Sequence, residues 1–445
     1  MRCGVARADI TPEPPILMGG YIGRTSPAEA VHDPLFARAM VLEDGPTRVA
    51  IVGADLLTAD RGLIARVRAS IQKNVGIPPS HCLVAFSHTH SGPLVSSRSD
   101  GDLDPGYVQR VEEALVDVVR RAASDLRPAR VGAGQIKLYL GINRRERRPD
   151  GSIALGRNPA GYASPYCRIL VAVEEGRGPM AIFFTYGAHP VVLGPKNLEI
   201  SGDYAGHAER MVEENFGDHA VALFALGFAG DVNVACEKRD FEEVETIGTA
   251  LARAVIEELK EMEVSAEAGL SAASRVVPLP AEPPPTAHEA ERLLYTERER
   301  LADLLGHGED RAEVEHHRRM VEWASRLVEL SRWGNTDPTL DLEVQTIRVG
   351  RTAIAALSAE VFAEFEKKAL PLSPRQPTFL VSNANGNIGY LPTAEAMAEG
   401  GYEVEVAHRY FGALRLAPQA PLLAEQALHA ALFDLASVPE STNQP

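Results

Sequence analysis

Residues 47–124 alternate apolar strands with amphipathic helices, and this alternation constrains the fold more than any other feature of the chain. TRVAIVGADLL (47–57) is rich in branched residues, as buried strands are, and a helical pattern of apolar residues follows at 61–74. HCLVAFSH (81–88) predicts a second strand, and residues 104–124 predict a second helix. This order favours α/β layers with the chemistry at the carboxyl ends of strands.

The same patterns continue through most of the 445 residues. Further strands are predicted at 129–140, 168–175, 179–186 and 220–233, a β-hairpin at 345–357, and helices at 203–215, 241–262 and 420–436. We therefore expect one α/β domain over residues 1–445, in which a mixed β-sheet core is layered with helices. We expect no C-terminal all-β module.

One segment, residues 285–333, differs from the rest in composition. It follows a proline-rich stretch, is charged and helix-favouring, and is broken once at GHGED (306–310). These features predict an inserted hairpin of two antiparallel helices. The hairpin is either a plain solvated element or a lid or dimerisation arm, so a homo-oligomer formed through it is one expectation.

Charge and hydropathy limit the possible partners. The formal net charge of −16, from 61 acidic and 45 basic residues, argues against nucleic acid or an anionic membrane surface as a partner, because both would repel the chain. No run approaches about 18 apolar residues, and the first residues lack the pattern of a secretory signal. We expect a cytoplasmic protein without stable membrane insertion. Its four cysteines form no CxxC pair, which argues against a thiolate zinc site.

AFSHTHSGP (85–93) places His88 and His90 at the end of a predicted strand. Two residues apart on a strand, both imidazoles would point to the same face and could converge on one ion or one substrate. A His-x-His pair taken alone is equally compatible with a metal site and with a hydrogen-bonded polar strand end.

A catalytic zinc site uses three protein ligands and an open position, so further donors are needed. FFTYGAHPVVLG (183–194) presents His189 at another strand end, where a lone histidine can also be structural. Glu360 follows the apolar run AIAAL, where a buried carboxylate needs a cation, or else begins a helix. The Asn- and Gly-rich stretch 381–405 has no room for a regular strand and is either a turn cluster or an active-site edge carrying Tyr390 and Tyr402.

Several short blocks of the chain resemble the catalytic domain of the neutral/alkaline non-lysosomal ceramidases. The blocks occur in the family's order over about residues 4–410, and they are DITP (9–12), GGY (19–21), SHTHSGP (87–93), GFAGDVN (227–233), AEVF (359–362) and NIGY (387–390). The resemblance implies one catalytic zinc ion per chain, held by the following residues: His88, His189, Glu360 and Tyr390. It places His90 beside the water that the metal activates, and Arg144 and Tyr402 near the substrate.

Elementary chemistry supports these implied roles. Zinc polarises a carbonyl and lowers the pKa of water, while His90 can accept a proton and return it. A tyrosine hydroxyl and the Arg144 guanidinium suit an oxyanion. The sequence thus predicts a zinc-dependent hydrolase that cleaves the amide bond of a small N-acyl substrate. The alternatives are a binuclear amidohydrolase of the barrel type and a catalytically silent protein that binds a metal and a ligand.

Overall fold

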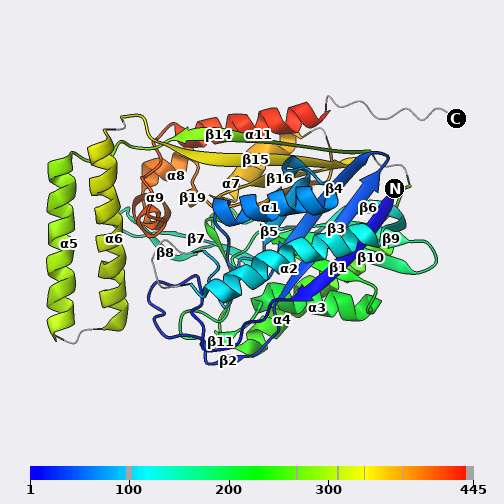
Figure 1. Cartoon of the computed structure of the whole chain (residues 1–445), viewed down its shortest axis with the longest axis horizontal. Helices are drawn as coiled ribbons and strands as arrows, with labels where there is room; N and C mark the ends of the chain where they lie inside the picture. Colours follow the sequence, from blue (N-terminus) through cyan, green and yellow to red (C-terminus); the bar gives the residue numbers. More distant parts are fainter. Residues whose placement is uncertain (97–102, 267–268, 308–309, 335, 374, 437–445) are drawn as a thin grey trace.

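The computed structural model describes residues 1–96, 103–266, 269–307, 310–334, 336–373 and 375–436 (Figure 1). The strands are β1 Arg2–Asp9, β2 Ala30–Val31, β3 Phe36–Asp44, β4 Thr47–Ala54, β5 Cys82–Phe86, β6 Arg127–Lys137, β7 Gly141–Arg147, β8 Ile153–Asn158, β9 Tyr166–Glu174, β10 Gly178–Tyr186, β11 Glu199–Ile200, β12 Val221–Leu226, β13 Val232–Val234, β14 Leu270–Pro280, β15 Thr339–Val349, β16 Thr352–Leu357, β17 Glu360–Val361, β18 Thr378–Val381 and β19 Tyr390–Leu391. The helices are α1 Arg61–Val75, α2 Pro105–Ser124, α3 Asp203–Phe216, α4 Phe241–Glu261, α5 Ala287–His307, α6 Arg311–Trp333, α7 Glu364–Ala369, α8 Ala394–Glu399, α9 Tyr402–Glu405, α10 Ala407–Tyr410 and α11 Ala420–Ala436.

The main sheet has eight strands in the order β12-β10-β9-β6-β1-β3-β4-β5. β4 and β5 are parallel, as are β10 and β12, and the other neighbouring pairs are antiparallel. The parallel pairs require crossovers, which α1 and α3 provide. The predicted α/β class with a mixed sheet is confirmed. Because the sheet is mixed and its end strands β12 and β5 are not paired to each other, it is not the closed parallel barrel that the binuclear alternative requires.

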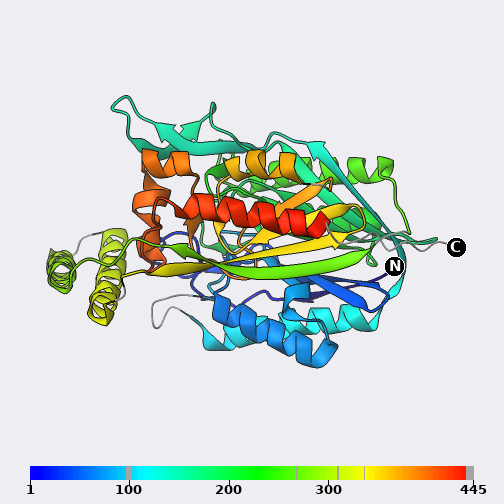
Figure 2. The ribbon, with the colours of Figure 1, turned by 90° about the horizontal axis from the view of Figure 1, so that it is seen from above.

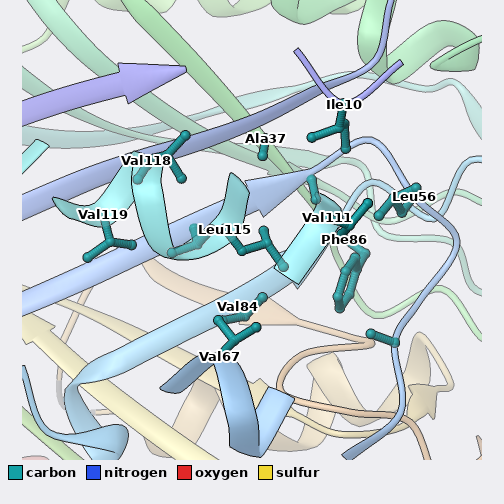
Figure 3. Packing of buried hydrophobic residues seen from close by; sticks show 14 of the residues in the cluster. Ile10, Ala37, Leu56, Val67, Val84, Phe86, Val111, Leu115, Val118 and Val119 are labelled. Carbon is teal, nitrogen blue, oxygen red and sulfur yellow. The ribbon is translucent and has the colours of Figure 1, made fainter. Parts of the chain in front are cut away.

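Helices cover one face of this sheet. α1 and α2 pack on β1, β3, β4 and β5 through a core that includes Leu115, Val118 and Val84, drawn in Figure 3. α3 and α4 pack on β9, β10 and β12 in a second core that includes Phe184 and Phe224. Side chains on the helix faces recur every three to four residues, so each helix buries one stripe against the sheet.

The other face of the main sheet packs on a second sheet of four strands, β14-β15-β16-β18. Ile51 and Phe183 from the first sheet meet Ile354 and Phe379 from the second in this inner core. α11 lies over the outer face of the second sheet, next to β14 and β15 in both views (Figures 1 and 2). The layers are therefore helix, sheet, sheet and helix, and loops from both sheets can reach one edge.

The predicted helical hairpin is present as α5 and α6 and stands out from the body of the molecule (Figure 1). α6 contacts the body through His316, whose Nδ1 lies 2.9 Å from the Tyr410 hydroxyl, and through Trp323, whose indole N–H donates to the Ala413 carbonyl at 3.1 Å. The predicted break at 306–310 lies partly outside the described residues. None of the helices in the described part of the chain is long and apolar enough to cross a bilayer.

The prediction that residues 381–405 have no room for a regular strand misses only the two-residue strand β19, but it does not anticipate the two helices in this stretch. This stretch contains the short strand β19 and the helices α8 and α9. Thr393 caps α8 by accepting a hydrogen bond from the backbone N–H of Ala396. The two glycines that follow separate the helices: Gly400 ends α8 and Gly401 precedes α9, both at positive φ.

Candidate active site

The predicted histidines and Glu360 lie just beyond the carboxyl ends of several strands. His88 and His90 follow β5, His189 follows β10, and Glu360 begins β17 shortly after β16. The main sheet supplies the histidines and the loop beyond the second sheet supplies the glutamate. The structure brings together side chains that are far apart in the sequence: ring centroids are 5.0 Å apart for His88 and His90 and 4.8 Å apart for His88 and His189.

Strand alternation does not place the two histidines of the His-x-His pair, contrary to our expectation. β5 ends at Phe86, and His88 adopts a left-handed backbone with φ of 66°. Such a conformation is strained for a residue with a side chain and is found mostly where the surroundings require it. The sharp turn at His88 brings its ring toward that of His90 with an angle of 84° between the ring planes.

Backbone carbonyls determine which nitrogen of each ligand histidine carries the proton. His88 Nδ1 lies 2.8 Å from the Leu57 carbonyl oxygen. His189 Nδ1 lies 2.9 Å and 3.0 Å from the carbonyl oxygens of Ala229 and Val232. A carbonyl oxygen only accepts, so Nδ1 of each ring is the donor and Nε2 of the neutral ring carries a lone pair.

Both Nε2 atoms face the same carboxylate oxygen. Glu360 Oε2 lies 3.3 Å from His189 Nε2 and 3.6 Å from His88 Nε2. All three side chains are buried, and His88 Nε2 has no hydrogen-bond partner among the described residues. Three lone pairs that converge without a proton between them repel one another unless a cation lies among them, so these residues fit a metal ion.

The ionisation states agree with this fit. Burial is the largest cause that lowers the pKa of His189, to about 4, and burial also lowers the pKa of His90 well below its usual value. Burial raises the pKa of Glu360, whereas a proton on His189 or His88 would lower it, so without a cation the carboxylate and the two rings compete for a proton. Neutral imidazoles and an ionised carboxylate are the forms that bind a metal.

His90 completes the cluster. One nitrogen from each of His88, His90 and His189 can be chosen so that all three lie within 4.8 Å of one another. Both ring nitrogens of His90 are buried and have no partner among the described residues. This placement allows either a third nitrogen ligand or a free base, so the predicted role of His90 as a base stays a prediction.

The loop that carries the GGY block packs directly on the His90 ring. Gly20 has φ of +100°, and a Cβ atom at this position would lie 2.3 Å from His90 Nδ1. The Tyr21 ring lies next to the imidazole, with a centroid distance of 5.0 Å. Only glycine allows this approach, so the loop holds Nδ1 of His90 against its backbone.

Tyr390 lies beside Glu360 because the two are paired residues of the parallel β17 and β19 ladder. Its hydroxyl accepts a hydrogen bond of 3.0 Å from Arg144 Nη2. Arg144 also donates to Glu403 at 2.9 Å and to Asn233 at 3.2 Å. Each terminal nitrogen of Arg144 keeps a second N–H, so the guanidinium can hold Tyr390 and still donate to a substrate.

Tyr402 lies behind Tyr390, with ring centroids 6.1 Å apart, and its ring continues to Tyr410 at 6.5 Å. Burial is the main cause that raises the pKa values of both Tyr390 and Tyr402, so both hydroxyls keep their protons. The structure therefore brings all seven predicted site residues to one region.

Sequence reasoning missed several contacts of this site. Asn387 donates to Glu360 Oε1 at 3.4 Å, and the Asn383 side chain lies 3.1 Å from His88 Nδ1. Asn383 has φ of 53°, a conformation that asparagine tolerates better than most residues. The alternating asparagines of SNANGN were the available signal. Arg24, which donates to the His90 carbonyl oxygen at 2.6 Å, had no signal beyond its closeness to GGY.

A sequence model of the family described as "Neutral/alkaline non-lysosomal ceramidase, N-terminal" matches residues 1–241. This is more than half of the chain. The chain belongs to this ceramidase family. The matched region contains His88, His90, Arg144 and His189, whereas Glu360, Tyr390 and Tyr402 lie beyond it.

Curated relatives agree with this family. Neutral ceramidases of Oryza sativa subsp. japonica and Drosophila melanogaster are each 27% identical to the chain, over 236 and 258 residues. The neutral ceramidase of Mycobacterium tuberculosis is 25% identical over 254 residues. These alignments cover 47%, 52% and 51% of this chain and 28%, 36% and 39% of the respective relatives, so the chain spans well under two thirds of their length.

Solved ceramidase structures share the fold over the whole chain. A ceramidase complexed with C2 superposes with a TM-score of 0.75 at 19% identity, and the neutral ceramidase from Pseudomonas aeruginosa with a TM-score of 0.72 at 20% identity. Each match covers 100% of this chain and 76% of the other. The second half of the chain, beyond the family model, therefore has the ceramidase fold as well.

Proposed function

We propose that the chain is a zinc-dependent hydrolase that cleaves the amide bond of an N-acyl substrate. The convergence of His88, His189 and Glu360 on one point, beside the unpartnered His90, carries this proposal. Membership of the ceramidase family supports an amide as the bond that is cleaved. Nitrogen and carboxylate oxygen are the donors that zinc takes in hydrolases, which favours zinc over calcium or magnesium.

His88, His189, Glu360 and Tyr390 would hold the ion. A zinc ion in this position would polarise the scissile carbonyl and lower the pKa of a nearby water. Arg144 orients the Tyr390 hydroxyl, and its contact with Glu403 fixes the guanidinium in turn. The ligands are thus held by a second layer of buried hydrogen bonds.

Hydrolysis adds one water molecule across the carbon–nitrogen bond, with the hydroxyl on the acyl carbon and the proton on the leaving amine. His90 Nε2 accepts the proton of the attacking water and returns it to the amine nitrogen, a task for which a neutral imidazole is suited. The free N–H groups of Arg144 and the Tyr402 hydroxyl donate to the oxyanion. Each such donor contributes about 3 kcal/mol to lowering the barrier.

The test is an activity panel of linear amides and esters with the full chain. We expect hydrolysis of at least one N-acyl amide, loss of activity on chelation, and recovery when one equivalent of zinc is added. Activity that survives complete metal removal would contradict the zinc site. Zinc binding without turnover of any amide or ester would favour the silent binding protein.

The remaining predictions on partners and location stay predictions. We propose a small-molecule amide as the partner and a cytoplasmic location. We also keep the homo-oligomer through residues 285–333 as a proposal, for which the exposed Trp333 and Leu305 of the hairpin are the supporting observations.

A further inference from the structure

Arg24 is a buried cation beside the candidate active site. Only 7% of its surface is exposed. Its Nη2 donates to the carbonyl oxygens of Gly19 and His90, while Nε and Nη1 are buried and have no partner among the described residues. A buried donor without a partner costs free energy, and a buried charge without a counterion costs more.

No carboxylate in the described structure compensates Arg24. Five of the other buried arginines each contact an acidic side chain, namely Arg38, Arg68, Arg144, Arg145 and Arg168. Arg24 instead stacks on the Tyr21 ring, with Cζ 5.2 Å from the centroid. Burial is the main cause that lowers the pKa of Arg24, to about 10, so the guanidinium still carries its charge at neutral pH.

The position of Arg24 connects it to the reacting region. Tyr21, on which it stacks, has its ring 5.0 Å from that of His90. The backbone N–H of Arg24 donates to the Tyr21 carbonyl at 3.1 Å, so residues 21–24 form a tight turn over His90. Because Nη2 of Arg24 donates to the His90 carbonyl oxygen, the guanidinium lies beside the residue at which a substrate amide would be held.

A second cation lies near the same turn. Arg239 is exposed, forms no ion pair with the described residues, and is close enough to Tyr21 to affect the phenol electrostatically. In a chain of net charge −16, two cations beside one phenol are a local exception, and the buried Asp203 is the carboxylate that also acts on Tyr21. Such a pair of cations attracts an anion toward the site. The bound anion would then neutralise the buried charge of Arg24.

We propose that Arg24 binds a carboxylate of the substrate, so that the chain acts on N-acyl amino acids rather than on neutral amides. This inference rests on the proposed amide hydrolysis. The carboxylate of an N-acyl amino acid lies one carbon from the amide nitrogen, which suits a cation adjacent to the base. Guanidinium Nε–H and Nη1–H donors form charge-assisted hydrogen bonds with it.

The test compares matched substrates. N-octanoylglycine and N-octanoylglycinamide differ only in the terminal charge, and N-octanoyl-O-phosphoethanolamine tests a phosphate. We expect kcat/KM of the wild-type zinc enzyme to be about tenfold or more higher for N-octanoylglycine than for the other two. In Arg24→Gln the ratio of kcat/KM for the glycine compound to that for the glycinamide compound falls toward one. Arg24→Lys keeps the charge and should retain part of the preference.

Arg120→Gln is the matched control, because Arg120 is an exposed arginine of α2 that is paired with Asp117. We expect its substrate ratio to equal that of the wild type. Equal wild-type activity on the glycine and glycinamide compounds would overturn the proposal. A preference for the phosphate compound would mean that Arg24 recognises phosphate rather than a carboxylate. An equal loss of kcat/KM on all substrates in both Arg24 variants would mean that the role of Arg24 is structural.

A binding measurement separates this proposal from the proposed function. The His90→Ala variant is titrated calorimetrically with N-octanoylglycine and with N-octanoylglycinamide. The same titrations are repeated with the double variant that carries both His90→Ala and Arg24→Gln. Tighter binding of the charged compound that depends on Arg24 supports carboxylate recognition even if the wild type hydrolyses no amide. Hydrolysis of amides without such a difference in binding leaves the proposed function and refutes the role of Arg24.

Discussion

Glu360 and Tyr390 are directly paired in the parallel ladder of β17 and β19, although 30 positions separate them in the sequence. The pairing holds the glutamate and the tyrosine side by side next to the histidine cluster. Because β17 and β19 have only two residues each, this short ladder is an anchor for the site rather than part of the core.

We expect Glu360→Gln to weaken metal binding. The substitution keeps the size of the side chain but removes the charge that compensates a cation among His88, His189 and Glu360. The affinity for zinc should fall by at least about tenfold, measured by competition with a chromogenic chelator. Glu364→Gln, in the partly exposed first turn of α7, should leave the affinity unchanged. An unaltered affinity in Glu360→Gln would remove this residue from the ligand set.

His90→Ala separates the two roles open to His90. If His90 is the base, its loss should lower kcat by about 10²- to 10⁴-fold while the protein keeps one equivalent of zinc. His88→Ala should instead lose the metal. Metal analysis after dialysis together with kcat measures both effects. If His90→Ala loses zinc to the same extent as His88→Ala, His90 is a ligand and another group must move the proton.

The fold was predictable where strands and helices have strong periodicity. The main strands β4, β5, β9, β10 and β12 and the helices α1 to α6 all fall close to the expected ranges. The missed strands β1 and β3 carry several alanines and arginines, so their alternation is weak. β14 was hidden by prolines at its end, where Pro278 and Pro280 occupy positions at the edge of the four-stranded sheet.

The site was predictable in its members but not in its geometry. Four histidine and glutamate positions came from the motifs, while their convergence depends on the left-handed turn at His88, which no periodicity encodes. The second layer of contacts is long-range: Arg144 meets Glu403, and Leu57 orients His88. Pairs of this kind depend on how two sheets stack, which a single sequence does not specify.

The metal-free protein should lose stability as the pH falls from about 6.5 to about 4. The pKa of His189 is lowered to about 4 by burial, so in this range the unfolded chain binds a proton that the folded chain excludes. The loss attributable to His189 should reach at most about 3 kcal/mol. Urea denaturation of the apoprotein at pH 7 and pH 4.5 measures it.

His189→Gln removes the titrating group and should flatten this acid dependence. His288→Gln, on the exposed face of α5, should keep the wild-type dependence. If the wild type and His189→Gln lose the same free energy between the two pH values, protonation of another group dominates the acid unfolding.

Glu403 compensates two buried arginines, since it accepts from Arg144 at 2.9 Å and from Arg145 at 3.0 Å with 1% of its side chain exposed. Glu403→Gln leaves Arg144 without an acidic partner, so the free energy of unfolding should fall by about 3 kcal/mol in urea denaturation of the metal-loaded protein. Glu399→Gln is the matched control: Glu399 also contacts Arg145 but is 37% exposed, and its loss should cost less than about 1 kcal/mol. Similar small losses in both variants would mean that water, rather than Glu403, compensates the two arginines.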